Sequence, residues 1–110
     1  MSNVEKTREK IKERAWELIR QFNELADEIE RKAARNEPIT DNDILGWTER
    51  YVTLLKELRT FEDLNLEELL DPVTRGSLLG VRMRVRDRIL ILEISRAVVR
   101  GVLEVRRDED

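Results

Sequence analysis

The sequence predicts an all-α fold, a single helical domain over residues 1–110 built from three to four helices. Along the first third of the chain, apolar residues recur in alternating steps of four and three, which is typical of one helix face. A helix-start pattern, in which a capping residue is followed three positions later by an acid, occurs at Ser2–Glu5, Thr40–Asp43 and Asn65–Glu68. These two observations predict a long first, a medium second and a short third helix before the C-terminal segment.

The first helix is predicted to span residues 2–35. One apolar line along it consists of Ile11, Ala15, Leu18, Phe22, Leu25 and Ile29. A second line beside the first consists of Trp16, Ile19, Ala26 and Ala33. Because a helix with two adjacent apolar lines usually contacts two neighbours, this helix is expected to pack against more than one other. It should end at Asn36-Glu37-Pro38, since the residue before a proline avoids the helical region.

The second helix is predicted to begin at Thr40 and to continue to about Phe61. Its expected buried face consists of Ile44, Trp47, Tyr51, Leu54, Leu55 and Leu58. A short third helix should begin at Asn65, and Asp71-Pro72 is predicted to end it.

The segment over residues 77–107 fits two interpretations. Residues Val81–Arg86 alternate between apolar and basic, which favours a strand, and residues 80–107 could form a small antiparallel meander in an α+β fold. The turns of such a meander would fall near Asp87-Arg88 and Arg96-Ala97, and neither pair contains the Gly or Asn that tight hairpins need. As a helix, the segment shows one narrow polar stripe of Arg82, Arg86, Glu93, Arg100 and Glu104. We therefore predict a long C-terminal helix.

The composition excludes several kinds of site. The chain has no cysteine and no histidine, so it lacks thiolate chemistry and the commonest general base and transition-metal ligand. Asp41–Gly46 matches the start of a calcium loop, but Leu45 and Val52 occupy positions that must supply ligands. No catalytic, cofactor or metal site is predicted. With no apolar run of membrane-spanning length and no signal-peptide core, we expect a cytoplasmic protein without a membrane partner.

Arginine and acidic residues are distributed unevenly. Sixteen arginines stand against five lysines, a bias found in heat-adapted proteins, in proteins from GC-rich genomes and in designed bundles. Residues 38–72 carry a net charge of −6 and residues 73–110 a net charge of +3, so the two segments are expected to lie against each other within one chain or across a dimer. The alternative is a nucleic-acid-associated protein that binds phosphates through Arg82, Arg84, Arg86 and Arg88.

A local resemblance concerns Glu24-Leu25-Ala26, Glu28-Ile29, Pro38-Ile39, Asp41 and Asp43. These residues resemble the junction of the first two helices in the all-helical chorismate mutases, and the order of long, medium and long helices is also similar. The resemblance implies an all-helical architecture. The Arg-Glu pair that the family carries early in its second helix is Ile44-Leu45 here, and Ser95 is followed four residues later by Val99 instead of Gln. We predict no enzymatic activity; a small enzyme that binds an anionic substrate through arginines is the remaining alternative.

The surplus of apolar surface predicts a protein interface. A helix over 77–107 has only one polar stripe, and three helices leave part of its surface uncovered. The chain is therefore predicted to be a non-enzymatic oligomerisation, scaffold or adaptor module, with a homodimer favoured and another helical protein as the alternative partner. The candidate interface residues are Trp16, Ile19, Trp47, Ile91, Val98 and Val105.

Overall fold

The computed structural model describes the backbone of residues 3–109 and the side chains of residues 3–101. Over this part of the chain the protein is an all-α three-helix bundle with no strand. The helices are α1 (Asn3–Ala34), α2 (Asp41–Asp63) and α3 (Pro72–Glu109), and a single 3-10 turn, η1 (Leu66–Leu69), lies between α2 and α3. The all-α prediction is confirmed. The alternative meander over residues 80–107 is wrong, because α3 runs through that segment without a break.

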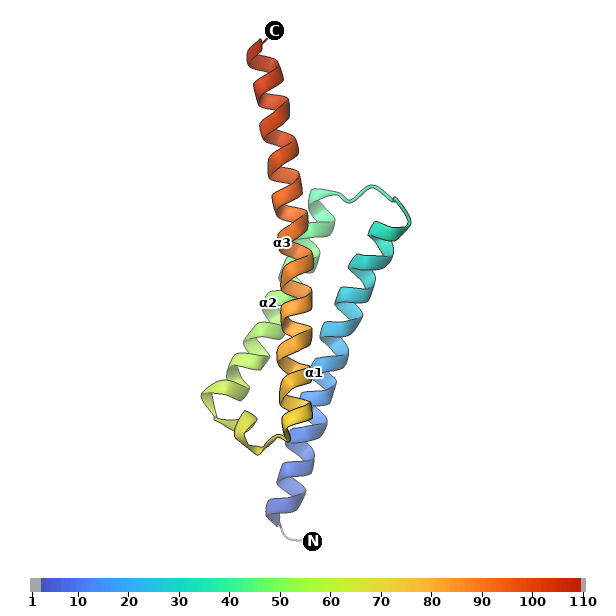
Figure 1. Ribbon diagram of the computed structural model, residues 1–110. Coiled ribbons are helices and arrows are strands. Elements are labelled where there is room, and N and C mark those ends of the chain that lie inside the picture. Colours follow the sequence, from blue (N-terminus) through green and yellow to red (C-terminus); the bar gives the residue numbers. More distant parts are fainter. Residues whose placement is uncertain (1–2, 110) are drawn as a thin grey trace.

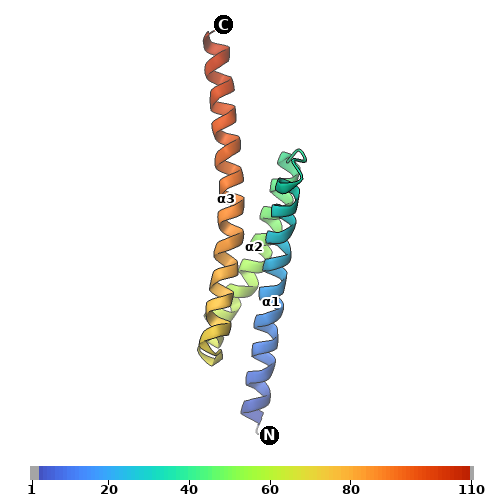
Figure 2. The ribbon, with the colours of Figure 1, turned by 45° about the vertical axis from the view of Figure 1, so that its right-hand side comes forward.

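The helices run up, down and up, and together they form a body of 74 × 28 × 21 Å (Figure 1). α3 packs against both α1 and α2. In both views of the ribbon, the C-terminal end of α3 extends well beyond the loop that joins α1 to α2 (Figures 1 and 2). The N-terminal part of α3 therefore packs in the bundle, and its C-terminal end projects beyond the other two helices.

Local side-chain chemistry explains where α1 ends and α2 begins. Asn36 has a φ of 54°, the left-handed conformation that asparagine adopts readily and that commonly follows a helix end. The Thr40 hydroxyl accepts a hydrogen bond from the Asp43 backbone N–H at 3.1 Å, and the Asp43 carboxylate accepts one from the Thr40 N–H at 2.9 Å. The capping box predicted at Thr40–Asp43 is confirmed. The one predicted at Ser2 lies outside the described residues.

The segment between α2 and α3 corrects two predictions. Asn65 does not cap a helix with its side chain; it has a φ of 54° and follows the end of α2, as Asn36 follows α1. Asp71-Pro72 begins a helix, since the Asp71 carboxylate accepts hydrogen bonds from the Thr74 N–H at 3.2 Å and from the Thr74 hydroxyl at 2.5 Å. Proline suits the first helical position, where its missing N–H would have no partner. α3 thus starts five residues before the predicted residue 77.

The core lies between the three helices, and α1 supplies the largest share of it. Its first predicted apolar line is buried from Ala15 to Ile29, and Ile11 packs against the edge. The predicted face of α2 is confirmed by the buried Ile44, Trp47, Leu54 and Leu58, while Tyr51 and Leu55 are partly buried against them. From α3, the core receives Leu78, Val85 and Ile89.

Candidate functional site

The burial of α3 changes at Ile89, the last residue of this helix whose side chain is buried among those described. From Leu90 to Gly101 no described side chain is buried, and only Leu92, Arg96 and Gly101 are partly covered. We call residues 90–109 the α3 extension. Because a helix in water is normally polar where it is uncovered, the apolar residues of the extension need an explanation.

Six exposed apolar residues lie on the side of α3 that faces away from α1 and α2. They fall within about 120° of one another on a helix with 3.6 residues per turn. Their side chains are 44–59% exposed, and they are Leu79, Met83, Leu90, Ile91, Ile94 and Val98. We call this set the outer stripe. Exposed apolar residues gathered on one face of a helix mark a protein interface rather than ordinary surface.

The structure separates the candidate interface residues into three groups. Ile91 and Val98 belong to the outer stripe, and Trp16 is 42% exposed on α1. Ile19 and Trp47 are only 4% and 6% exposed, so they fill the core of the single chain and do not present a surface to a partner. Their expected position is corrected for a physical reason: the packing of α1, α2 and α3 encloses Ile19 and Trp47, whereas Trp16, on the same apolar line as Ile19, stays exposed. The side chain of Val105 lies outside the described residues.

A groove of about 370 Å³ extends the apolar surface to the inner side of α3, where the helix leaves the bundle. Its apolar walls are Ile39, Ile44, Leu92 and Val99. Two arginines form its rim. Arg96 donates to the Ile39 carbonyl at 2.8 Å and to the Asp41 carboxylate at 2.5 Å, and Arg100 donates to Asp41 at 3.0 Å. These contacts attach the base of the α3 extension to the start of α2.

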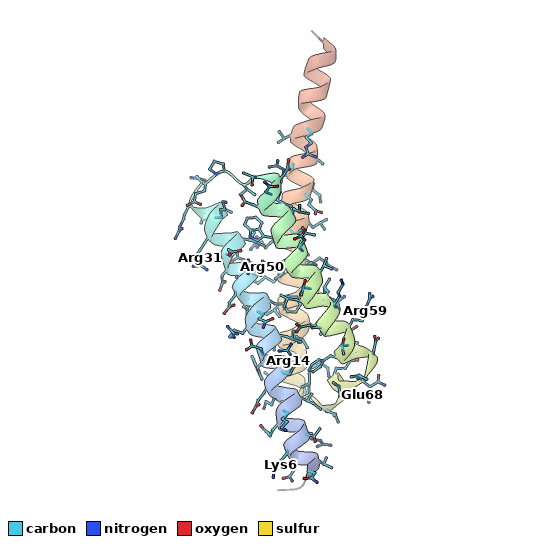
Figure 3. The ribbon with its side chains drawn as sticks, turned by 180° about the vertical axis from the view of Figure 1, so that it is seen from behind. Lys6, Arg14, Arg31, Arg50, Arg59 and Glu68 are labelled. Atoms are coloured by element: carbon cyan, nitrogen blue, oxygen red, sulfur yellow. The ribbon has the colours of Figure 1, made fainter. Side chains whose placement is uncertain are left out.

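The charged side chains on α1 and α2 mostly point to solvent, as the view from behind shows (Figure 3). Among those labelled, Arg14 of α1 pairs with Glu57 of α2 at 2.5 Å, and Arg50 of α2 pairs with Glu28 of α1. The α1–α2 surface is therefore rich in charge, whereas the outer stripe of α3 is apolar.

Two of the four candidate phosphate-binding arginines pair with acids of α1. Arg84 donates to Asn23 at 2.9 Å, to Asp27 at 3.0 Å and to Glu30 at 2.6 Å. Arg88 donates to the other oxygen of Glu30 at 3.0 Å. These bonds stabilise the charged form of the carboxylate, so the hydrogen bond from Arg84, reinforced by Arg88, holds the pKa of Glu30 below its ordinary value.

The other two arginines of that cluster lie on a different side of α3. Arg82 contacts Glu62 of α2 at 3.3 Å, and Arg86 contacts its neighbour Asp87 at 3.5 Å. The helix thus divides the cluster into Arg82 with Arg86 and Arg84 with Arg88, because only residues three or four apart share a helix face. Arg82, Arg96 and Arg100 contact acids of the segment 38–72 within one chain, as the charge distribution suggested.

The Glu30 contacts predict how stability depends on pH. A carboxyl whose pKa is lower in the folded than in the unfolded state stabilises the folded protein at any pH above the unfolded pKa of about 4.3. This stabilisation is lost as the pH falls through the pKa of the folded state. The pKa values of Glu17, Asp43 and Asp71 are lowered as well. The main cause is the hydrogen bond from Arg20 for Glu17, from Lys32 for Asp43 and from Thr74 for Asp71. Thermal unfolding should therefore occur at lower temperature at pH 3 than at pH 7.

The substitution Glu30→Gln removes the contribution of Glu30 to this pH dependence and leaves the contributions of the other three carboxyls. The variant should be less stable than the parent at pH 7, and this difference in stability should narrow as the pH falls toward 3, because protonation of Glu30 in the parent removes the same negative charge. Glu24→Gln is a matched control on α1, because Glu24 pairs only with Arg20 of the same helix among the described residues. If Glu30→Gln were destabilised by the same amount relative to the parent at pH 7 and at pH 3, the lowered pKa of Glu30 would be contradicted.

Within residues 3–109, no helix has the length and apolar character needed to cross a membrane. Residues 3–101, whose side chains the structure describes, contain no cluster of three or more acidic side chains placed to hold a metal ion. Comparison of the chain with family models, with curated proteins and with solved structures gave no match. The class defined by the fold is an all-α three-helix bundle in which one helix extends beyond the others and has an exposed apolar stripe.

Proposed function

We propose that the chain is a non-enzymatic oligomerisation module that holds copies of itself together through the outer stripe of α3 and so acts as a scaffold or adaptor. The observation that carries the proposal is the row of six half-exposed apolar side chains from Leu79 to Val98. Removing such surface from water contributes about 25 cal/mol for each Å² of apolar area, so covering it strongly favours association.

The position of the outer stripe supports the same function. A residue that serves the monomer's own core would face α1 and α2, as Val85 and Ile89 do. The outer stripe faces the opposite way, and its last residue, Val98, lies between Arg96 and Arg100, whose side chains contact the start of α2 on the other side of α3. A partner that contacts this surface would therefore reach it without rearranging the three helices.

The proposal predicts the mass of the protein in solution. Size exclusion coupled to light scattering should report at least twice the chain mass of 13.1 kDa at micromolar concentration. On dilution the mass should fall toward that of one chain, because the assembly is held by an interface and not by covalent bonds. A mass of one chain even at millimolar concentration would contradict the proposed function.

A further inference from the structure

We propose that two copies of the chain pair through α3 in antiparallel orientation, so that the α3 extension of each copy covers the outer stripe of the other from Met83 to Val98. This proposal rests on the proposed function and names its partner and its geometry. A second copy is the occupant because the chain's own charges and side-chain sizes complement each other when α3 is reversed against itself.

The charge along α3 favours the antiparallel orientation. Residues 72–90 contain five arginines and one acid, a net charge of +4, which Asp27, Glu30 and Glu62 of α1 and α2 neutralise in part. Residues 104–110 contain four acids and two arginines, a net charge of −2. In an antiparallel pair, the basic part of each helix lies beside the acidic end of the other. In a parallel pair, the two basic parts would lie side by side, and like charges at an interface oppose association.

The apolar residues define a register for this pair. Ile91, Ile94, Val98 and Gly101 follow steps of three, four and three, the spacing that keeps one helix seam facing another. With Ile94 of one copy opposite Val98 of the other, Ile91 falls opposite Gly101. The two-fold axis then passes close to residue 96, and each of these contacts occurs twice.

The residues beside this seam are small or apolar. On a helix with 3.6 residues per turn, Leu90 and Ala97 flank the seam on one side and Ser95 flanks it on the other. Leu92 and Val99, two walls of the groove, lie on the inner side of α3 and take no part in the seam. The residues that flank the seam near the two-fold axis are therefore uncharged.

Gly101 is a further indication that a second helix packs closely against the seam of α3. Inside a helix, glycine is less favourable than every residue except proline. Within the single chain nothing requires glycine at this position, because an added Cβ would meet no atom within 4 Å. Opposite Ile91 of a second copy, the missing side chain provides the space that the isoleucine occupies. A large residue facing a small one is the arrangement that lets two helices approach closely.

Spin labels on single cysteines test the orientation, because the chain has no cysteine of its own. Val98→Cys and Leu79→Cys each place one label on the outer stripe, at side chains that are 59% and 56% exposed in the single chain. In the proposed register the two labels at 98 should lie under about 25 Å apart, since they are almost level on neighbouring helices. The two labels at 79 should lie about 50 Å apart, at opposite ends of the pair. An excess of unlabelled chain should abolish both couplings.

The remaining outcomes separate this proposal from the proposed function. Short distances at both positions would mean a parallel pair and would overturn the antiparallel orientation, while the assembly through α3 would stand. Long distances at both positions in a sample with dimer mass would mean that copies meet through another surface, which overturns the pairing through α3. A monomer mass by light scattering, without coupling at either position, would overturn this proposal and the proposed function together.

Discussion

Phe22→Ala is expected to lower the free energy of unfolding by about 3–5 kcal/mol, the usual cost of removing a large aromatic side chain from a core. Phe22 is completely buried on α1, and its ring meets that of Tyr51 on α2 edge to face, with centroids 6.2 Å apart. A domain of ordinary stability has only about 5–15 kcal/mol in total. The variant should therefore unfold at a much lower urea concentration than the parent.

Trp16→Ala is the matched control for this prediction, since Trp16 is also an aromatic residue of α1 but is 42% exposed. Its loss should cost about 1 kcal/mol, because much of the side chain already contacts water. Both variants and the parent are compared by urea unfolding at one protein concentration, followed by circular dichroism. If Phe22→Ala lowered the free energy of unfolding no more than Trp16→Ala, the core would not lie where α1 meets α2 and α3.

The fold was predictable from local features of the sequence. The spacing of apolar residues from Ala15 to Ile29 marks the buried face of α1, and the capping box at Thr40 marks the start of α2. The start of α3 is harder to predict. The pair Asp71-Pro72 is compatible with a helix end, but an aspartate followed by a proline also begins a helix when residue 74 supplies the N–H that the carboxylate binds.

The proposed interface could be predicted only in part, because a sequence pattern does not say which neighbour covers which face. Ile19 and Trp47 look like surplus apolar residues in the sequence, yet the packing of α2 and α3 against α1 encloses both. On α3, polar residues separate two apolar faces. Only the packing of α1 and α2 decides that Val85 and Ile89 face inward and that Met83, Leu90 and Ile94 face outward. Those last three residues and Leu79 complete the outer stripe, and the sequence does not distinguish them from core residues.

Replacing Ile94 by aspartate is expected to dissociate the assembly while leaving the three-helix fold in place. Ile94 is 54% exposed in the single chain, so a carboxylate there remains in water in the monomer. In the pair, each copy would bring one aspartate into the apolar seam, and a charge buried without a partner is strongly unfavourable. A total cost of about 3 kcal/mol corresponds to a roughly 100-fold increase in the dissociation constant.

Leu64→Asp provides the control, because Leu64 is 62% exposed and follows α2 at the end of the bundle away from the α3 extension (Figure 1). Sedimentation equilibrium on the parent and both variants gives the dissociation constants, and circular dichroism reports whether helix content is retained. Ile94→Asp should sediment as a folded monomer at concentrations where the parent and Leu64→Asp remain associated. If Ile94→Asp kept the parent's dissociation constant, or if Leu64→Asp weakened association equally, the seam at Ile94 could not be what holds the copies together.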